Sequence, residues 1–433
     1  LSSMLSFESS AHVKKTSIPI ASMSKFEDVS ANMRINDVLA LEQSDWEAIS
    51  TNEVNNFGYS KSAFWLKVIF MKPQEDCCIL TVSYTPLDYL DFYQVIDGTR
   101  LVHQQSGDRY AFDVRPFHDR HNTFRVDFSS NEPTVFYLRI QSESILQLPL
   151  EYRTDIEFAQ TLGQENFFLG LFYGGLLLIA VYNAFVFFRL RDKVYAYYLF
   201  FVMSAALSAA CWDGLAFHYL WPNAPDWASR SIPITTGLLT FCTLLFSQEL
   251  LQIRKNMPWV NIIVELTKAV SVLLIVMTYI VSYSTVGQLS FAVAIGSGVI
   301  GMLVGIAALY KRIEGSGLYL AAWSLLFVGV SMNSMANIGL IHDSVLTNYL
   351  MHLGGVVEVC LFSVALVNRI KLLKQDKQDA ETRMSIERQI AQDKANTLAI
   401  ISHELRTPMN AVLGFVYLAK QGKGQLSTQD YLE

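Results

Sequence analysis

Residues 165–188 read ENFFLGLFYGGLLLIAVYNAFVFF, an apolar stretch whose one charged side chain is Glu165. A bilayer core about 30 Å thick needs about 20 helical residues, each rising about 1.5 Å, so this stretch is long enough to cross a membrane. Comparable apolar stretches follow at 194–212, 231–251, 266–283, 286–310, 317–341 and 345–368. The sequence therefore predicts a seven-helix transmembrane bundle over residues 161–370.

The composition is that of a membrane protein. Of the 433 residues, 52% are hydrophobic and only 17% are charged, which is too apolar for an ordinary soluble enzyme. The net charge of −6 provides no basic surface for nucleic acid, so we expect no DNA or RNA partner. The five cysteines include one adjacent pair and three in apolar runs, which does not indicate a disulfide framework.

The distribution of basic residues predicts the orientation in the membrane. They follow the first, third, fifth and seventh predicted spans, whereas the intervening loops contain only Arg230. The residues concerned are Arg189, Arg191, Lys193, Arg254, Lys255, Lys311, Arg312, Arg369, Lys371 and Lys374. Because basic loops stay in the cytoplasm, the N-terminal region is expected outside it and the C-terminus inside.

Residues 1–160 are predicted to form an all-β domain. Between Phe64 and Phe70, apolar side chains alternate with Trp65, Lys67 and Ile69, the period of two expected of a strand with one buried face. Further short runs rich in β-branched and aromatic residues lie at 79–84, 87–96, 124–128, 135–141 and 146–152. These runs predict an antiparallel sandwich, and its 22 acidic against 14 basic residues make it the acidic part of the chain.

Two groups in this domain are candidates for ligand binding. Sandwiches often bind sugars through exposed aromatic residues, although aromatic residues in strands more often form the core. The aromatic candidates are Trp46, Trp65, Tyr84, Tyr89, Tyr93 and Tyr110. The sequence His118-Asp119-Arg120-His121 contains metal-ligating residue types but lacks two further partners. We therefore expect a loop there and no metal site.

Ionisable residues inside the predicted spans are candidates for function, because burying them in lipid is costly. Glu265 and Lys268 can pair on one helix face at the membrane edge, where anchoring is the simpler interpretation. Glu358 lies six residues after His352, so the two side chains should not pair. Helix packing is favoured over a ligand or proton path for all such residues. Two amides also share a face of the sixth span, Asn333 and Asn337.

The C-terminal region predicts one long helix that leaves the membrane. The segment 371–397 is highly charged, and we interpret it as a signalling helix with a weak coiled-coil seam. The following segment predicts a homodimer, with His403 facing water and Thr407 one turn further on the same face. Its nearly complete a/d seam consists of Leu398, Ile401, Leu405, Pro408, Val412, Phe415 and Ala419.

The stretch SHELRTPMNAVLGF at residues 402–415 resembles the phosphoacceptor box of sensor histidine kinases, especially hybrid kinases with a receiver domain. The resemblance implies that His403 accepts a phosphoryl group from ATP at Nε2. It also implies that Glu404 orients the ring through Nδ1 and acts as a base. Thr407 would position water for dephosphorylation of a response regulator, and Pro408 would bend the helix.

Residues 398–433 would then begin a dimerisation and histidine phosphotransfer domain. Kinases of this kind bind ATP with Mg²⁺ in a separate catalytic domain, which has an Asn-rich box and a glycine-rich lid. Neither motif lies between Phe415 and Glu433, so we expect the chain as given to accept phosphate but to bind no ATP.

The order of an acidic β domain, seven spans and a signalling helix resembles bacterial seven-transmembrane receptors with diverse intracellular signalling modules. Ser106-Gly107-Asp108, Phe112 and Arg115 are similar to a recurrent stretch in the extracellular domain of that family. The resemblance implies a jelly-roll sensor domain on the periplasmic side of a bacterial inner membrane. It also implies an unidentified periplasmic ligand, for which a carbohydrate is one candidate.

The sequence as a whole predicts a multidomain membrane protein that acts as a homodimeric sensor histidine kinase of a two-component system. It would sense an extracytoplasmic ligand, phosphorylate itself at His403 and transfer the phosphoryl group to a response regulator or receiver domain. Two alternatives stay open. One is a membrane receptor or scaffold without its own kinase domain, and the other is a transporter with a regulatory tail.

Overall fold

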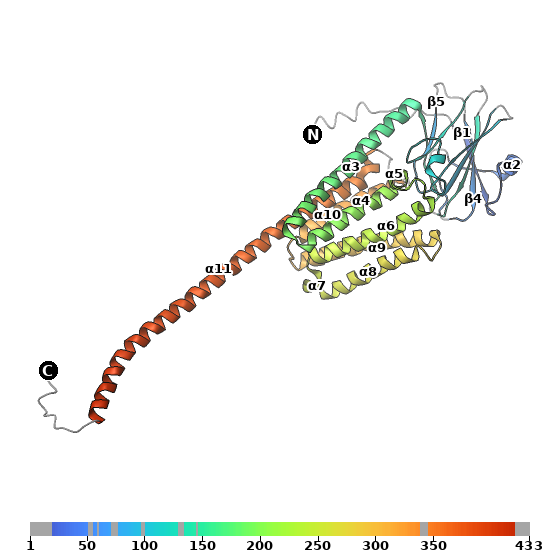
Figure 1. Cartoon of the computed structure of the whole chain (residues 1–433). Helices are drawn as coiled ribbons and strands as arrows, with labels where there is room; N and C mark the ends of the chain where they lie inside the picture. Colours follow the sequence, from blue (N-terminus) through green and yellow to red (C-terminus); the bar gives the residue numbers. More distant parts are fainter. Residues whose placement is uncertain are drawn as a thin grey trace. The chain divides into compact units, whose positions relative to one another are not determined.

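The computed structural model describes residues 20–50, 55–58, 60–70, 77–96, 100–128, 134–143, 146–337 and 345–420. The chain divides into two compact units, Leu1–Leu366 and Val367–Glu433. The first unit contains a β-domain, residues 20–154, and a bundle of apolar helices, residues 155–366 (Figure 1).

The described part of the β-domain contains two larger antiparallel sheets and one short strand pair. The six-stranded sheet has the order β2 (Glu47–Ala48), β1 (Ile20–Asp28), β4 (Ala63–Phe70), β9 (Thr134–Gln141), β6 (Tyr89–Ile96) and β7 (Arg100–Ser106). The three-stranded sheet has the order β11 (Leu150–Thr154), β5 (Cys77–Val82) and β8 (Asn122–Arg125). The short pair joins β10 (Gln147–Leu148) to β3 (Asn55–Asn56).

The two larger sheets pack face to face around one hydrophobic core. Leu66 and Phe92 of the six-stranded sheet meet Leu80 and Phe124 of the three-stranded sheet, and all four side chains are fully buried. The rings of Phe92 and Phe124 stack with centroids 5.4 Å apart. Each such side chain stabilises the fold by about 1.5–3 kcal/mol through burial. The predicted sandwich is confirmed, while its jelly-roll character stays a prediction.

The opposite face of the six-stranded sheet is buried around Trp65. Trp65 is fully buried with Trp46 and Tyr137, and Val38 of the short helix α2 (Ile35–Leu39) packs in the same cluster. The 3₁₀ turn η2 (Gln43–Asp45) immediately precedes Trp46. The prediction that this strand has one buried face is therefore wrong, because α2 and the segment around Trp46 cover its second face. Trp46 and Trp65 are core residues.

Most predicted strands are present, with shifted ends. The runs at 79–84, 87–96, 124–128 and 135–141 correspond to β5, β6, β8 and β9, whereas the run at 146–152 is divided at Pro149 into β10 and β11. Proline has no N–H to donate to a sheet. The alternation does not predict β1 or β7, whose sequences IASMSKFED and RLVHQQS are rich in polar residues. β7 is an edge strand, which needs fewer apolar residues.

The bundle contains several long apolar helices joined by short ones. Their bounds are α3 (Asp155–Leu190), α4 (Lys193–Trp212), α5 (Leu215–Tyr219), α6 (Pro225–Leu250), α7 (Ile253–Asn256), α8 (Pro258–Met277), α9 (Tyr283–Tyr310), α10 (Ser316–Asn337) and α11 (Val345–Lys420). Among the described residues, six helices are long and apolar enough to cross a membrane, including the Tyr349–Lys371 part of α11. The apolar part described in α10, Ser316–Met332, is shorter, and residues 338–341 of that predicted span lie outside the described residues.

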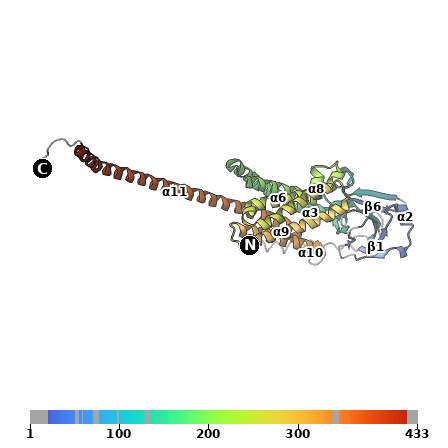
Figure 2. The same ribbon diagram turned by 90° about the horizontal axis from the view of Figure 1, so that it is seen from below.

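Helix α6 lies in the middle of the bundle, where it packs against α4, α8 and α9 (Figures 1 and 2). Aromatic side chains bring α11 into the same interior. Phe362 of α11 lies with its ring 5.2 Å from Phe246 of α6 and 5.8 Å from Phe201 of α4. Tyr198 Oη donates a hydrogen bond of 2.6 Å to the carbonyl of Val359. The last predicted span is thus held inside the bundle.

The intramembrane residues Glu265 and Lys268 form the predicted pair, with 2.9 Å between Lys268 Nζ and Glu265 Oε2. Lys268 Nζ also donates a hydrogen bond of 2.9 Å to Gln248 Oε1 of α6. The side chain of Lys268 is only 7% exposed, so it joins α8 to α6 and is not the edge anchor that we predicted. Glu358 is buried and does not contact His352, whose partner is described below. The side chains of Asn333 and Asn337 lie outside the described residues.

The second unit is the remainder of α11, which is helical to Lys420 and continues through Pro408. The helix is continuous through Pro408, and the bend that we predicted there stays a prediction. Apolar side chains of the predicted seam are exposed, among them Leu398, Leu405 and Phe415. A single copy of the chain therefore leaves the seam uncovered, and the coiled coil stays a prediction. Residues 421–433 of the expected phosphotransfer domain lie outside the described residues.

Candidate functional site

The turn that follows β7 is built around Gly107. Ser106 Oγ donates a hydrogen bond of 2.7 Å to Asn122 Oδ1, and both side chains are buried. Gly107 has a φ of +123°, and a Cβ at this position would lie 2.3 Å from the carbonyl oxygen of Asp88. Such a close approach at a positive φ admits only glycine. The stretch Ser106-Gly107-Asp108 is therefore a structural turn that fixes the start of the next loop.

Arg115 joins the two ends of that loop, residues 107–121, through hydrogen bonds. Its Nη1 donates hydrogen bonds to the carbonyls of Arg120 and Asp119 at 3.0 and 3.3 Å, and its Nη2 donates to the carbonyl of Gly107 at 3.2 Å. Burial lowers the pKa of Arg115 to about 10, against the opposing effect of the nearby carboxylates Asp108 and Asp119. The guanidinium therefore stays charged at neutral pH, which strengthens its hydrogen bonds to the carbonyl oxygens.

The loop presents Phe112 to the helix bundle. Phe112 begins the 3₁₀ turn η3 (Phe112–Val114), and its ring lies 5.5 Å from Phe217 and 4.4 Å from His218 of α5. The backbone N–H of Phe112 donates a hydrogen bond of 3.0 Å to the carbonyl of Pro222. The residues that resemble a recurrent family stretch thus dock the β-domain on α5, and Figure 1 shows α5 beside the sheets.

A second set of contacts, which we call the junction network, leads from the β-domain into the bundle. Arg120 Nη2 lies 2.7 Å from Glu165 Oε2 of α3, and Arg120 Nη1 donates to the carbonyl of Asp213 at 3.4 Å. Tyr173 Oη of α3 donates a hydrogen bond of 2.6 Å to Asp213 Oδ2. His352 Nε2 of α11 lies 3.1 Å from Asp213 Oδ1. Contacts of hydrogen-bond length therefore connect the β-domain, α3, the end of α4 and α11.

The cluster His118-Asp119-Arg120-His121 is part of a loop, as predicted. His121 Nδ1 lies 3.3 Å from Asp119 Oδ2 and 3.7 Å from Glu165 Oε2. Although burial raises the pKa of Asp119, its hydrogen bond to His121 and the nearby positive charges lower that pKa below its ordinary value. Within the described ranges, no group of three or more His, Cys, Asp or Glu side chains could hold a metal ion. This loop contributes to the junction network.

On the same face of the six-stranded sheet as Trp65, towards β7, lies a polar cluster around Asp91, which we call the Asp91 cluster. The carboxylate Oδ1 accepts hydrogen bonds from Gln105 Nε2 at 3.0 Å and Tyr110 Oη at 3.2 Å, and His103 Nε2 lies 3.1 Å away. The ring of His103 stacks on Tyr93 with centroids 4.3 Å apart. Of the aromatic candidates, Tyr89, Tyr93 and Tyr110 are half-buried on this face.

Both phenols of the Asp91 cluster stay protonated at neutral pH. Burial and the charge of Asp91 together raise the pKa of Tyr93 to about 12. Burial and Asp91 also raise the pKa of Tyr110. Because Tyr110 and Gln105 already donate to the buried carboxylate of Asp91, the cluster presents mainly the stacked rings of Tyr93 and His103, with their polar edges, to a ligand.

The predicted phosphoacceptor residues lie together on α11. His403, Glu404 and Thr407 are all exposed, and Thr407 Oγ1 donates a hydrogen bond of 3.4 Å to the carbonyl of His403. Every side chain from Gln378 to Leu418 is exposed, so exposure does not distinguish the His403 face from the seam. The helix keeps His403 and Thr407 one turn apart on one face, as the sequence spacing requires.

Sequence reasoning missed the junction network. Arg120 and Glu165 are separated by 45 positions, and Arg120 and Asp213 by 93, so no local pattern joins them. Two signals were available in the sequence: an acidic residue at each of two predicted span ends, Glu165 and Asp213, and a histidine inside the seventh span, His352.

Two family models match adjacent parts of the chain. Residues 21–154 match the model described as 7TMR-DISM extracellular 2, and residues 165–369 match the model described as 7TM diverse intracellular signalling. Together they cover the β-domain and the bundle, including every contact of the junction network. Among curated proteins, none matches the sequence.

Proposed function

Since the chain carries a 7TMR-DISM extracellular domain and a 7TM diverse intracellular signalling domain, we propose that it is the receptor part of a sensor histidine kinase. In this role the β-domain senses a ligand outside the cytoplasm. The bundle transmits the change through the membrane, and His403 accepts a phosphoryl group.

The observation that carries this proposal is the stretch 402–415 of α11. It presents His403 on an exposed helix, next to Glu404 and one turn before Thr407. A histidine that accepts phosphate must reach a nucleotide held by another domain, which a buried ring cannot do. The position of this stretch beyond a receptor bundle supports a signalling role.

The proposed chemistry is transfer of the γ-phosphoryl group of ATP to imidazole. The lone pair of His403 Nε2 attacks the γ-phosphorus, a P–N bond forms, and the bond from phosphorus to the bridging oxygen breaks to release ADP. Glu404 holds the Nδ1 proton and so fixes the tautomer with a free Nε2 lone pair. A separate catalytic domain would hold ATP with Mg²⁺, which neutralises charge on the phosphates.

The proposed assembly is a homodimer that passes phosphate to a response regulator or a receiver domain. The support is the exposed seam, because apolar side chains such as Leu398, Leu405 and Phe415 need a covering partner in water. Thr407 would position the water that removes phosphate from the partner.

The proposed ligand site is the Asp91 cluster on the six-stranded sheet. The stacked rings of Tyr93 and His103, with polar groups around them, suit a carbohydrate, which has apolar faces and many hydroxyl groups. The basic residues after alternate spans support a periplasmic β-domain and a cytoplasmic C-terminus in a bacterial inner membrane.

To test this, the full-length protein that the gene encodes is incubated with ATP that carries a label on the γ-phosphate. We expect acid-labile label on the wild type and none on His403→Gln. The matched control is His118→Gln, which removes an exposed imidazole of the β-domain outside the Asp91 cluster and should keep the label. Equal labelling of His403→Gln would remove His403 from its role.

The alternatives give different results in the same system. A scaffold without its own kinase domain would show no label until a separate kinase is added, and the label would then depend on His403. A transporter would move a substrate into vesicles at a rate that His403→Gln does not change.

A further inference from the structure

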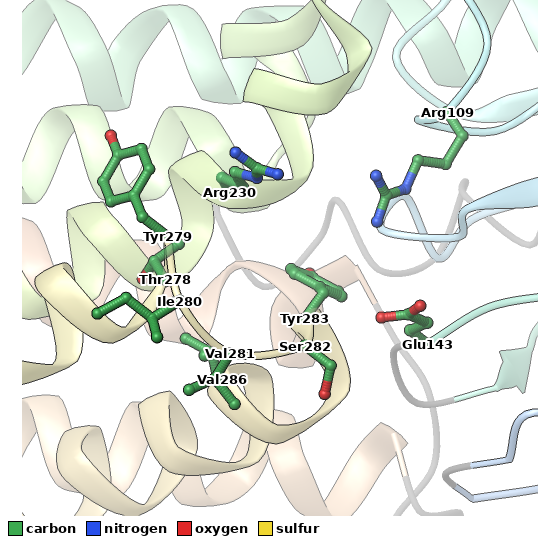
Figure 3. Close-up of a pocket in the computed structure, with 10 residues that line it drawn as sticks. All are labelled: Arg109, Glu143, Arg230, Thr278, Tyr279, Ile280, Val281, Ser282, Tyr283 and Val286. Atoms are coloured by element: carbon green, nitrogen blue, oxygen red, sulfur yellow. The ribbon is translucent and has the colours of Figure 1, made fainter.

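A cavity lies where the β-domain meets the outer end of the bundle (Figure 3). Its volume is about 330 Å³, at the lower end of the range for small-molecule sites. Arg109 and Glu143 line it from the β-domain, Arg230 from α6, and residues 278–282 from the connection between α8 and α9. None of these residues belongs to the Asp91 cluster or the phosphoacceptor stretch.

The charges around the cavity are not balanced. Arg109 is already paired, with its Nε 3.2 Å from Asp88 Oδ1 and its Nη1 3.3 Å from Asp226 Oδ1. Glu143 Oε2 accepts a hydrogen bond of 3.3 Å from the backbone N–H of Ser284. Arg230 is exposed and, within the part of the chain that the structure describes, has no hydrogen bond or ion pair. The unmatched group is therefore a guanidinium, which binds phosphate through two parallel hydrogen bonds.

The cavity wall beside Arg230 contains exposed apolar and aromatic side chains, which can contact lipid. Tyr279 and Ile280 line the cavity and are 59% and 75% exposed, in the short connection between two apolar helices. Val281 and Val286 add further apolar surface inside the cavity. Tyrosine beside arginine at the end of apolar helices is typical of the headgroup region of a bilayer. In Figure 3 the side chain of Arg230 extends from α6 towards the space above Tyr283.

We propose that this cavity binds the anionic headgroup of a membrane lipid in the leaflet on the side of the β-domain. The lipid phosphate contacts Arg230, and the first acyl carbons lie along Ile280 and Tyr279. A soluble phosphate shares the anionic group but makes no use of these apolar side chains, which is why the proposal commits to the lipid. The site needs only the first unit of the chain, and it stands whether or not His403 accepts phosphate.

The experiment is a titration of the full chain in detergent with phosphatidylglycerol, with the first bound lipid counted by native mass spectrometry. We expect the wild type to bind phosphatidylglycerol more tightly than phosphatidylcholine. Arg230→Gln should weaken the first phosphatidylglycerol by roughly tenfold, because one charged hydrogen-bonding group is lost. The matched control is Arg100→Gln, an exposed arginine of the β-domain, which should leave the affinity unchanged.

A second variant tests the site independently of any effect of Arg230 on folding. Glu143→Gln removes the carboxylate that lines the same cavity, so phosphatidylglycerol should bind it more tightly than it binds the wild type. Three results would overturn the proposal: equal affinity of Arg230→Gln and wild type, equal affinity for the two lipids, or unchanged affinity of Glu143→Gln. Displacement of the lipid by millimolar inorganic phosphate would also overturn it, because a soluble anion would then be the ligand.

Discussion

Asp108 is a buried carboxyl group close to a second one, Asp88. Burial raises the pKa of Asp108 well above its ordinary value, and the charge of Asp88 raises it further, against the opposing charges of Arg109 and Arg115. A carboxyl group with a raised pKa favours the folded state when it is protonated. Its contribution to stability is complete below the ordinary pKa and is lost as the pH rises through the raised pKa.

The variant Asp108→Asn should therefore gain stability over the wild type as the pH rises. The amide resembles the protonated carboxyl group and stays neutral at every pH, so it does not repel Asp88 when the wild-type side chain ionises. We expect the melting temperature of the variant, minus that of the wild type, to increase between about pH 4 and pH 8. Thermal unfolding in detergent measures it, with the exposed Asp113→Asn as control. A difference that falls with pH would contradict the account.

For single residues, the sequence indicates which ones matter but not which distant residues they contact. The resemblance selects Gly107, Phe112 and Arg115, but their docking role depends on Phe217 and His218, which lie about 100 positions away in the sequence. The His403 stretch is a local pattern of 14 residues, 402–415, so the sequence alone identifies it. The partners of Asp213 come from separate elements, which no local pattern can predict.

The junction network joins the loop 107–121 to three helices through partly buried charges. The side chains of Arg120 and Glu165 are only 11% and 19% exposed, so removal of one partner takes the main opposite charge away from the other in a poorly hydrated place. By contrast, Lys25 and Glu47 form an ion pair on the surface of the β-domain, with 3.2 Å between Nζ and Oε2.

The variant Arg120→Ala should accordingly destabilise the first unit much more than Lys25→Ala does. We expect a loss of about 3 kcal/mol for the buried pair and less than about 1 kcal/mol for the surface pair. Thermal unfolding of the purified full chain compares the two variants. A loss for Arg120→Ala no larger than that for Lys25→Ala would show that the β-domain does not dock through this network.

Two adjacent isoleucines of α11, one on the predicted seam and one beside it, allow a matched test of dimerisation. Ile401 lies on the a/d seam and Ile400 on a neighbouring face, and the two are exposed by 47% and 64% in the single chain. Ile401→Asp should abolish cross-linking between two copies in the membrane, because it buries a charge in the dimer interface. Ile400→Asp should leave cross-linking unchanged. Equal effects of the two variants would contradict a dimer through this seam.

The sequence predicts those helices and strands whose own residues show a clear hydropathy pattern. Long apolar helices such as α3 and α9 follow from hydropathy, because the lipid requires an unbroken apolar stretch. The short helices α5 and α7 and the strand β7 have no such pattern. Their positions depend on contacts with other elements, such as the packing of Phe112 on α5.

At the scale of the whole molecule, the β-domain and the bundle form one compact unit, and the rest of α11 begins a second. The order of domains follows from the sequence, because charge and hydropathy change sharply near residues 160 and 370. Docking of the β-domain on α5 does not follow from the sequence, since it rests on side chains from distant segments. The contacts of Asp213 with Arg120 and His352 connect the docked β-domain to α11.

The central claim requires that the β-domain and His403 lie on opposite sides of the membrane, because we propose that the chain carries a signal between them. The most direct test places single cysteines at Ser44 and Ser402, both exposed, in a chain without its native cysteines. A membrane-impermeant maleimide should label Ser44→Cys in intact spheroplasts and Ser402→Cys only after lysis. Labelling of both positions in intact spheroplasts would place them on one side of the membrane and contradict the account.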